Sequence, residues 1–216
     1  MTRTVHVTLY QFDELPTDAA KEKAREWYRE ASAGDSFWSE SVIEDAETIA
    51  GLMGIEFARR TFQTMGGGTG TEPRVFWSFY TQGSGASFEG TWTYKANSLA
   101  AVKDHAPIDP KLHRIATILG GANLAGLRAT LTANRLANHY THERTIDIEV
   151  ERDDEDRPEV TKEQDDEVTE ALRDYMTWIH DHLEKEYEYQ NADEQIDENM
   201  TANEYEFHED GRRARD

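Results

Sequence analysis

The sequence contains no cysteine, and this absence excludes several kinds of protein. A disulfide framework is ruled out, as are zinc and iron–sulfur sites with thiolate ligands. No apolar run approaches the ~18 residues that a membrane-spanning helix needs. Because no apolar stretch follows Met1, no secretory signal is expected, and we predict that the protein acts in the cytoplasm.

Positive charge is scarce. The chain has 23 Lys and Arg against 44 Asp and Glu, which gives a formal net charge of −21. Phosphate backbones and anionic lipids would repel such a chain, so direct binding to nucleic acid or membranes is not expected. Only 7 of the basic residues are Lys, a bias that also fits a protein adapted to a salt-rich cytoplasm.

The acidic residues that are present gather near the end of the chain. Residues 143–210 hold 27 acidic and 6 basic side chains, whereas the rest of the chain has 17 of each sign. Acidity that serves solubility or salt adaptation is normally spread along a sequence. A concentrated negative field attracts basic partners and speeds their association. Both interpretations stay open, and the confinement to one third of the chain favours recognition.

The apolar pattern predicts an α+β fold. Helices are expected from Thr17, over about 36–53, as one or two short helices over 98–119, from Thr161 to about 190, and over about 194–202. Strands are expected over 5–10, early in 55–65, over 75–80, 88–94, 127–133 and 146–150, and near 204–207. Consecutive strands joined by short turns indicate an antiparallel sheet of hairpins with helices packed on one side. We predict a single domain over residues 1–210, whose acidic helical part covers about 160–210, and a disordered basic tail over 211–216.

The long helix from Thr161 carries the strongest candidate site. Its apolar stripe should face the core, and most of its carboxylates fall off that stripe. Like charges three or four residues apart destabilise a helix slightly, a cost that a basic partner would relieve. We predict a partner-binding face of eight residues: Glu163, Asp166, Glu167, Glu170, Asp174, Asp181, Glu184 and Glu188.

Two predicted hairpin turns offer a different kind of site, for a small ligand or for a metal-dependent enzyme. Their polar residues are Gln82, Ser84, Glu89, His139, His142 and Glu143. Imidazoles and carboxylates could bind a metal together, but His residues in a hairpin are more often structural. The glycine-rich turn joins two strands, which is not the strand-to-helix context of a nucleophilic serine. No catalytic residue, metal or cofactor is predicted.

Three stretches, at 12–28, at 78–90, and at 183–189 together with 203–207 and 209–213, resemble a family of small acidic proteins encoded by phages and prophages of proteobacteria. Members are usually uncharacterised and are sometimes labelled antitoxins of toxin–antitoxin stability systems. The family's usual turn looks like Gln-Gly-Asp-Gly, and this chain has Ser84 in place of the Asp. Any chemistry that used this carboxylate would therefore be missing here. The resemblance implies a mobile-element protein that acts inside a bacterium.

Together these observations predict a non-enzymatic inhibitor of the antitoxin or anti-CRISPR type. Its acidic face would mimic nucleic acid and bind a basic nucleic-acid-binding protein, either a toxin or a defence effector. Self-association into a homodimer is left open. The alternatives are the ligand site or enzyme at the hairpin turns, and a structural accessory protein of a salt-adapted host.

Overall fold

The computed structural model describes residues 6–33, 37–64, 66–79, 83–134, 142–153 and 158–214. The chain forms two compact units: unit 1 comprises residues 1–40 and 185–216, and unit 2 comprises residues 41–184. Compactness alone does not show that a unit folds independently, so the single domain stays a prediction. Two helices, α2 (Phe37–Leu52) and α5 (Lys162–Gln190), have residues in both units.

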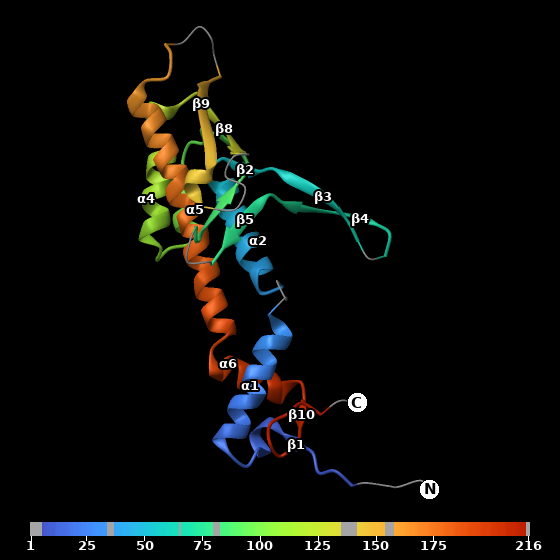
Figure 1. Cartoon of the computed structure of the whole chain (residues 1–216). Coiled ribbons are helices and arrows are strands. Elements are labelled where there is room, and N and C mark those ends of the chain that lie inside the picture. Colours follow the sequence, from blue (N-terminus) through green and yellow to red (C-terminus); the bar gives the residue numbers. More distant parts are fainter. Residues whose placement is uncertain are drawn as a thin grey trace. The chain divides into compact units, whose positions relative to one another are not determined.

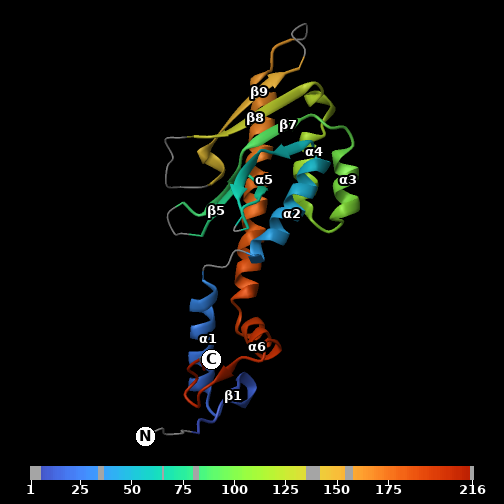
Figure 2. The same cartoon turned by 90° about the vertical axis from the view of Figure 1, so that its right-hand side faces the viewer.

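A four-stranded antiparallel sheet forms the centre of unit 2. Its order is β2 (Ile55–Phe57), β7 (Gly90–Thr93), β8 (Leu127–Ala133) and β9 (Ile146–Arg152). Leu127, Ala129 and Leu131 of β8 are buried while the residues between them are exposed, so only one face of the sheet is covered. The helices of unit 2 include α3 (Ser98–His105) and α4 (Pro110–Leu119), and Figure 2 shows α5 running beside β7, β8 and β9. The predicted α+β fold is confirmed.

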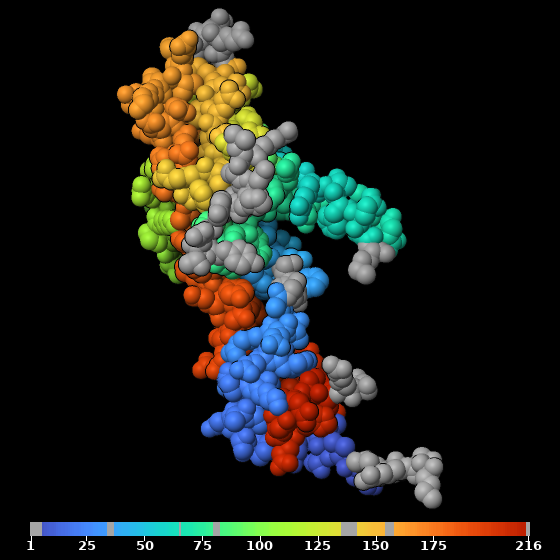
Figure 3. Space-filling model, viewed as in Figure 1, coloured from blue at the N-terminus to red at the C-terminus, as the bar shows by residue number. Residues whose placement is uncertain are grey.

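Two smaller hairpins complete unit 2. β5 (Val75–Ser78) pairs with β6 (Gly85–Phe88), and β3 (Arg59–Gln63) pairs with β4 (Thr69–Pro73). The β3–β4 hairpin leads away from the rest of the unit (Figures 1 and 3). The sequence did not indicate this hairpin, because the glycine-rich run over 66–70 predicts a loop, whereas β4 already begins within it at Thr69.

The predicted return strand over 88–94 is wrong, because it is two strands with different partners. β6 pairs with β5, whereas β7 pairs with β2 and β8. The break falls at Glu89, whose carbonyl accepts the Ala58 N–H at 2.8 Å and whose N–H donates to the Arg74 carbonyl at 3.0 Å. Gly90 follows because a Cβ there would lie 2.1 Å from the Glu56 carbonyl oxygen.

Unit 1 packs α1 (Asp18–Ser32) and α6 (Asp193–Ala202) around a small apolar core. This core contains Phe12, Leu15, Ala20, Ala24, Ile196, Met200 and Phe207. The short 3-10 helix η1 (Phe12–Glu14) follows β1 (Tyr10–Gln11), which pairs with β10 (Glu206–Phe207). The predicted strand over 5–10 is therefore wrong apart from Tyr10: residues 6–9 are exposed and unpaired, because β10 offers only two residues for pairing. Val5 lies outside the described residues.

The described part of the predicted basic tail is ordered within unit 1. Arg213 forms a bridge with Phe207, and the Ala214 N–H donates to the Glu206 carbonyl at 2.9 Å. Ala214 is consequently buried. The chain turns at Gly211, where φ is +81° and a Cβ would lie 2.0 Å from the Ala20 carbonyl oxygen. This close approach holds the end of the described chain against α1.

Helix termini agree with the sequence signals. The Thr17 hydroxyl accepts the Ala20 N–H at 3.1 Å and caps α1. At the start of α5, Thr161 and Gln164 form a capping box, with reciprocal distances of 3.2 and 3.3 Å. Across the described residues, no helix combines the length and apolarity needed to cross a membrane.

Candidate functional site

The helix α5 is fixed in unit 2 by its apolar face. Val168, Leu172, Tyr175, Met176, Ile179 and Leu183 are buried as predicted, and Ala171 and Trp178 join them. Tyr187, which the sequence places on the same core face, is instead 44% exposed. Tyr187 belongs to unit 1, whereas the buried residues of α5 belong to unit 2. The apolar stripe of α5 therefore does not pack into one continuous core.

A polar network also holds α5 against α4. The Trp178 indole N–H donates to Asp109 Oδ2 at 2.7 Å, and Asp109 Oδ1 accepts the Leu112 N–H at 2.9 Å, which caps α4. The His182 ring lies over Trp178 with 3.9 Å between centroids. Desolvation raises the pKa of Asp109, but the hydrogen bonds from Leu112 and Trp178 and the nearby His182 outweigh it, so this pKa is lowered.

The predicted carboxylates lie on one face of α5. At about 100° per residue, all eight positions fall within an arc of about 100°. Every one of them is exposed or half-exposed. We call the seven that belong to unit 2 the acidic face: Glu163, Asp166, Glu167, Glu170, Asp174, Asp181 and Glu184. Glu188 has the same angular position on the helix but belongs to unit 1.

Part of this negative charge is neutralised within the chain. Four ion pairs, with N–O distances between 2.6 and 3.6 Å, join Lys162 to Asp166, Arg173 to Glu170, Arg114 to Asp174 and Lys111 to Asp181. Among the described residues, Glu163, Glu167 and Glu184 have no ion-pair partner, although Glu167 accepts a hydrogen bond from the Asn123 amide at 2.8 Å. Surface pairs of this kind contribute only about 0–1 kcal/mol each, so a basic partner can exchange with them. Sequence reasoning missed Lys111 and Arg114, because nothing in the sequence links α4 to α5.

The second predicted site, at the hairpin turns, is only partly described. Gln82 and His139 lie outside the described residues. Ser84 Oγ lies 3.0 Å from Nε2 of His180 on α5, a contact that the sequence did not indicate. The same hydroxyl donates to the Ser78 carbonyl at 3.2 Å. A hydroxyl has one proton to donate, so Ser84 cannot donate to the Ser78 carbonyl and to His180 at the same time.

The remaining residues of that site have structural contacts. Glu89 is buried, accepts the Ala133 N–H at 3.0 Å and forms an ion pair with Arg74. The carboxylate therefore ties the β6–β7 junction to β8.

His142 and Glu143 are engaged in local structure as well. His142 Nδ1 accepts the Arg144 N–H at 3.1 Å, at the start of the 3-10 helix η3 (Glu143–Thr145). Glu143 Oε1 forms an ion pair with Nε of Arg144 at 3.5 Å. Within the part of the chain that the structure describes, no three His, Cys, Asp or Glu side chains come together to hold a metal ion.

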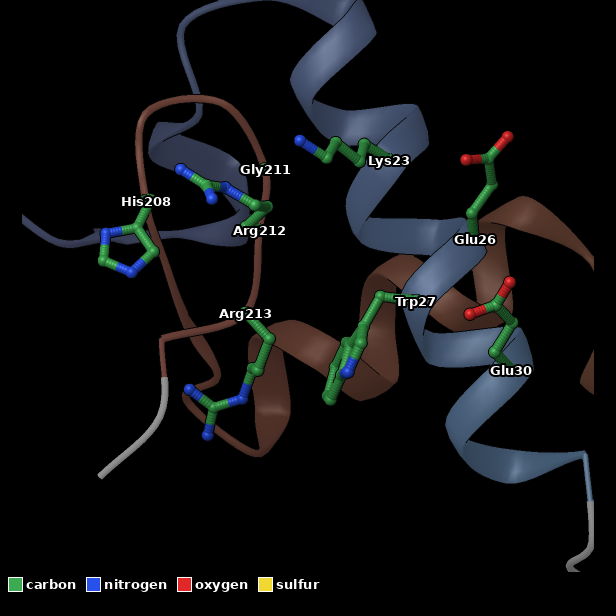
Figure 4. Close-up of a pocket in the computed structure, with 8 residues that line it drawn as sticks. All are labelled: Lys23, Glu26, Trp27, Glu30, His208, Gly211, Arg212 and Arg213. Carbon is green, nitrogen blue, oxygen red and sulfur yellow. The ribbon is translucent and has the colours of Figure 1, made fainter.

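Unit 1 carries a pocket of about 850 Å³ between α1 and the loop that follows β10 (Figure 4). It is lined by Lys23, Glu26, Trp27, Glu30, His208, Gly211, Arg212 and Arg213. Asp210 accepts from Lys23 at 2.9 Å and from the Arg212 guanidinium at 2.8 Å. The hydrogen bond from Lys23, followed by the one from the Arg212 backbone N–H, lowers the pKa of Asp210 to about 2. The Arg213 guanidinium lies over the rings of Trp27 and Tyr205. The basic groups of the pocket are thus engaged within the chain.

Residues 38–193 match the model of a family described as a domain of unknown function, DUF8835, and the chain belongs to this family. The matched segment contains all eight predicted carboxylates of α5. It leaves out α1, β10 and most of α6, which belong to unit 1. No curated protein and no solved structure matches the chain.

Proposed function

We propose that this protein is a non-enzymatic binding protein that neutralises a basic, nucleic-acid-handling protein through the acidic face of α5. The observation that carries the proposal is the arrangement of the carboxylates. Seven acidic side chains of unit 2 share one exposed face of a helix whose opposite face is buried. A coherent negative surface of this kind attracts basic grooves and orients them.

The charge spacing favours a particular kind of mimicry. Glu163 and Glu184 are separated by about 32 Å of helix, at about 1.5 Å per residue. Seven carboxylates over this length give one charge per roughly 5 Å. A single DNA strand has about one charge per 3.4 Å and a duplex about one per 1.7 Å. The acidic face therefore resembles one strand, and a partner that binds a single-stranded backbone suits it better than one that grips a duplex.

The partner class follows from the same argument. Toxins and defence effectors that act on nucleic acid present basic grooves to phosphates. A phage or prophage protein that acts in the bacterial cytoplasm would neutralise such a groove by presenting carboxylates in place of phosphates. The resemblance to phage-encoded acidic proteins supports this role.

Capture from a bacterial lysate tests the proposal. The immobilised full chain is compared with a variant that reverses three acids of the face: Glu163→Lys, Glu167→Lys and Glu184→Lys. The control variant makes the same change in net charge elsewhere in unit 2, at three exposed acids: Asp104→Lys, Asp147→Lys and Glu149→Lys. Circular dichroism first confirms that both variants fold, and mass spectrometry identifies the captured proteins.

The wild type and the control are expected to retain a basic nucleic-acid-binding protein, and the face variant is expected to lose it. The association should also weaken steeply with added salt, because exposed charges are screened over about 10 Å at 0.1 M ionic strength. Equal capture by the face variant and the control would contradict the proposal, since the position of the reversed acids would then make no difference to binding.

A further inference from the structure

A second pocket of unit 1, of about 440 Å³, has aromatic walls. It is lined by Tyr28, Arg29, Ser32, Ala33, Phe37, Trp38, Tyr187, Gln190 and Asn191. The Trp38 and Tyr187 rings lie 5.6 Å apart at 60°. Phe37 is 74% exposed and Tyr187 is 44% exposed. Exposed aromatic rings on a pocket wall are typical of anchor points for a partner's side chain.

The two amide side chains of this pocket present acceptors. Gln190 Nε2 donates to Glu186 Oε1 at 2.8 Å, and Asn191 Nδ2 donates to the Tyr187 carbonyl at 2.8 Å. A carboxylate and a carbonyl can only accept, so both amide orientations are fixed by chemistry. Among the described residues, neither amide oxygen has a hydrogen-bond partner. The pocket therefore offers oxygen acceptors together with aromatic faces.

The charge around the pocket favours a cation. Arg29 lines the pocket, but it forms ion pairs with Glu22 and Asp193, so its own charge is compensated. Residues 186–198 contain six acidic side chains and no basic one. Among the described residues, Glu188 in this segment has no ion-pair partner, and an incoming positive group meets a net negative surrounding.

We propose that this pocket binds the guanidinium group of an arginine side chain on the partner. This inference rests on the proposed function, because it is the basic partner that supplies the arginine. A guanidinium is planar, stacks on aromatic rings, and has five N–H donors and no acceptor. It therefore complements a pocket that is lined by aromatic rings and by amide groups with acceptor oxygens. The ammonium group of lysine lacks the planar surface. The urea group of citrulline, which is otherwise similar in shape to a guanidinium, lacks the charge.

A titration with a small arginine analogue tests this site without the partner. The ¹⁵N-labelled full chain is titrated with acetyl-arginine methylamide, and parallel titrations use the lysine and citrulline analogues. Saturable shifts are expected at the Trp38 indole N–H and at the side-chain amides of Gln190 and Asn191. The lysine analogue should bind more weakly, and the citrulline analogue should leave these signals in place. Equal shifts with citrulline, or none with arginine, would overturn the proposal.

Two neighbouring tyrosines provide a matched pair of variants. Tyr187 lines the pocket, whereas Tyr189 is exposed on the same helix and does not. Tyr187→Ser should weaken arginine binding about 2- to 5-fold, the contribution of one ring at an exposed site, and Tyr189→Ser should leave it unchanged. Equal weakening by both would refute the assignment. The titration does not involve the acidic face, so its failure would leave the proposed capture through the acidic face intact.

Discussion

Asp109 serves two neighbours with one carboxylate, so its removal should destabilise unit 2 more than the loss of a helix cap alone. Oδ1 accepts the Leu112 N–H at the start of α4, and Oδ2 accepts the Trp178 indole N–H from α5. Asp109→Ala removes the cap, which costs about 0.5–2 kcal/mol. It also leaves the buried indole N–H without an acceptor, which costs about 1–3 kcal/mol. We therefore expect a loss of about 1.5–5 kcal/mol in the free energy of unfolding.

Asp109→Asn separates the two contributions. Leu112 and Trp178 donate to different oxygens of Asp109, and Asn replaces one of these oxygens with an NH2 group that cannot accept. The free energy of unfolding of Asp109→Asn should fall between those of the wild type and Asp109→Ala. Urea unfolding at pH 7, followed by circular dichroism and by tryptophan fluorescence, measures all three proteins. A loss below about 1 kcal/mol for Asp109→Ala, or equal losses for both variants, would refute the assignment.

The same residue predicts a pH dependence. The pKa of Asp109 in the folded protein is below its usual value of 3.8, because the hydrogen bonds and His182 outweigh desolvation. Ionised Asp109 therefore stabilises the folded state at pH values above 3.8. This stabilisation disappears as the pH falls through the pKa of Asp109 in the folded protein. The stability difference between the wild type and Asp109→Ala should be constant near neutral pH and should narrow below pH 3.8.

Two further predictions concern the backbone and unit 1. Gly90→Ala should prevent stable folding of unit 2, since its Cβ would lie 2.1 Å from the Glu56 carbonyl oxygen. The new Cβ of Gly51→Ala in α2 meets nothing within 4 Å, so this variant should be more stable by about 0.5–1 kcal/mol. Thermal melts measure both variants, and a normal melt for Gly90→Ala would contradict the prediction. Lys23→Met should raise the pKa of Asp210 from about 2 towards 3.8, because the Lys23 hydrogen bond is the largest cause of the lowered value. An NMR titration of the Asp210 carboxyl measures this shift, and an unchanged pKa would show that Arg212 alone sets it.

Local signals in the sequence were enough to predict the parts of the fold that depend on neighbouring residues. The capping box at Thr161 and the alternation along β8 are examples, since each involves residues close in sequence. The acidic face was also predictable, because a helical period places its members on one side. What could not be predicted depends on distant contacts. The strand break at Glu89 arises because its carbonyl pairs with Ala58, 31 positions earlier in the chain.

The same limit applies to the sites. The acids of α5 looked uncompensated in the sequence, yet Lys111 and Arg114 of α4 pair with two of them. The pocket at Trp38 and Tyr187 joins residues separated by most of the chain, so no motif could indicate it. Ser84 and His180 likewise have no relation in the sequence, and only the fold brings them within 3.0 Å.

Competition between single-stranded DNA and the acidic face for the captured partner tests the central claim most directly. The purified partner is bound to the immobilised full chain, and an unstructured oligonucleotide is added at constant salt. If the acidic face occupies the groove for a nucleic-acid backbone, the oligonucleotide should displace the partner completely, and the matching duplex should need a higher concentration. A stable complex that contains the partner, the oligonucleotide and this protein together would contradict the account.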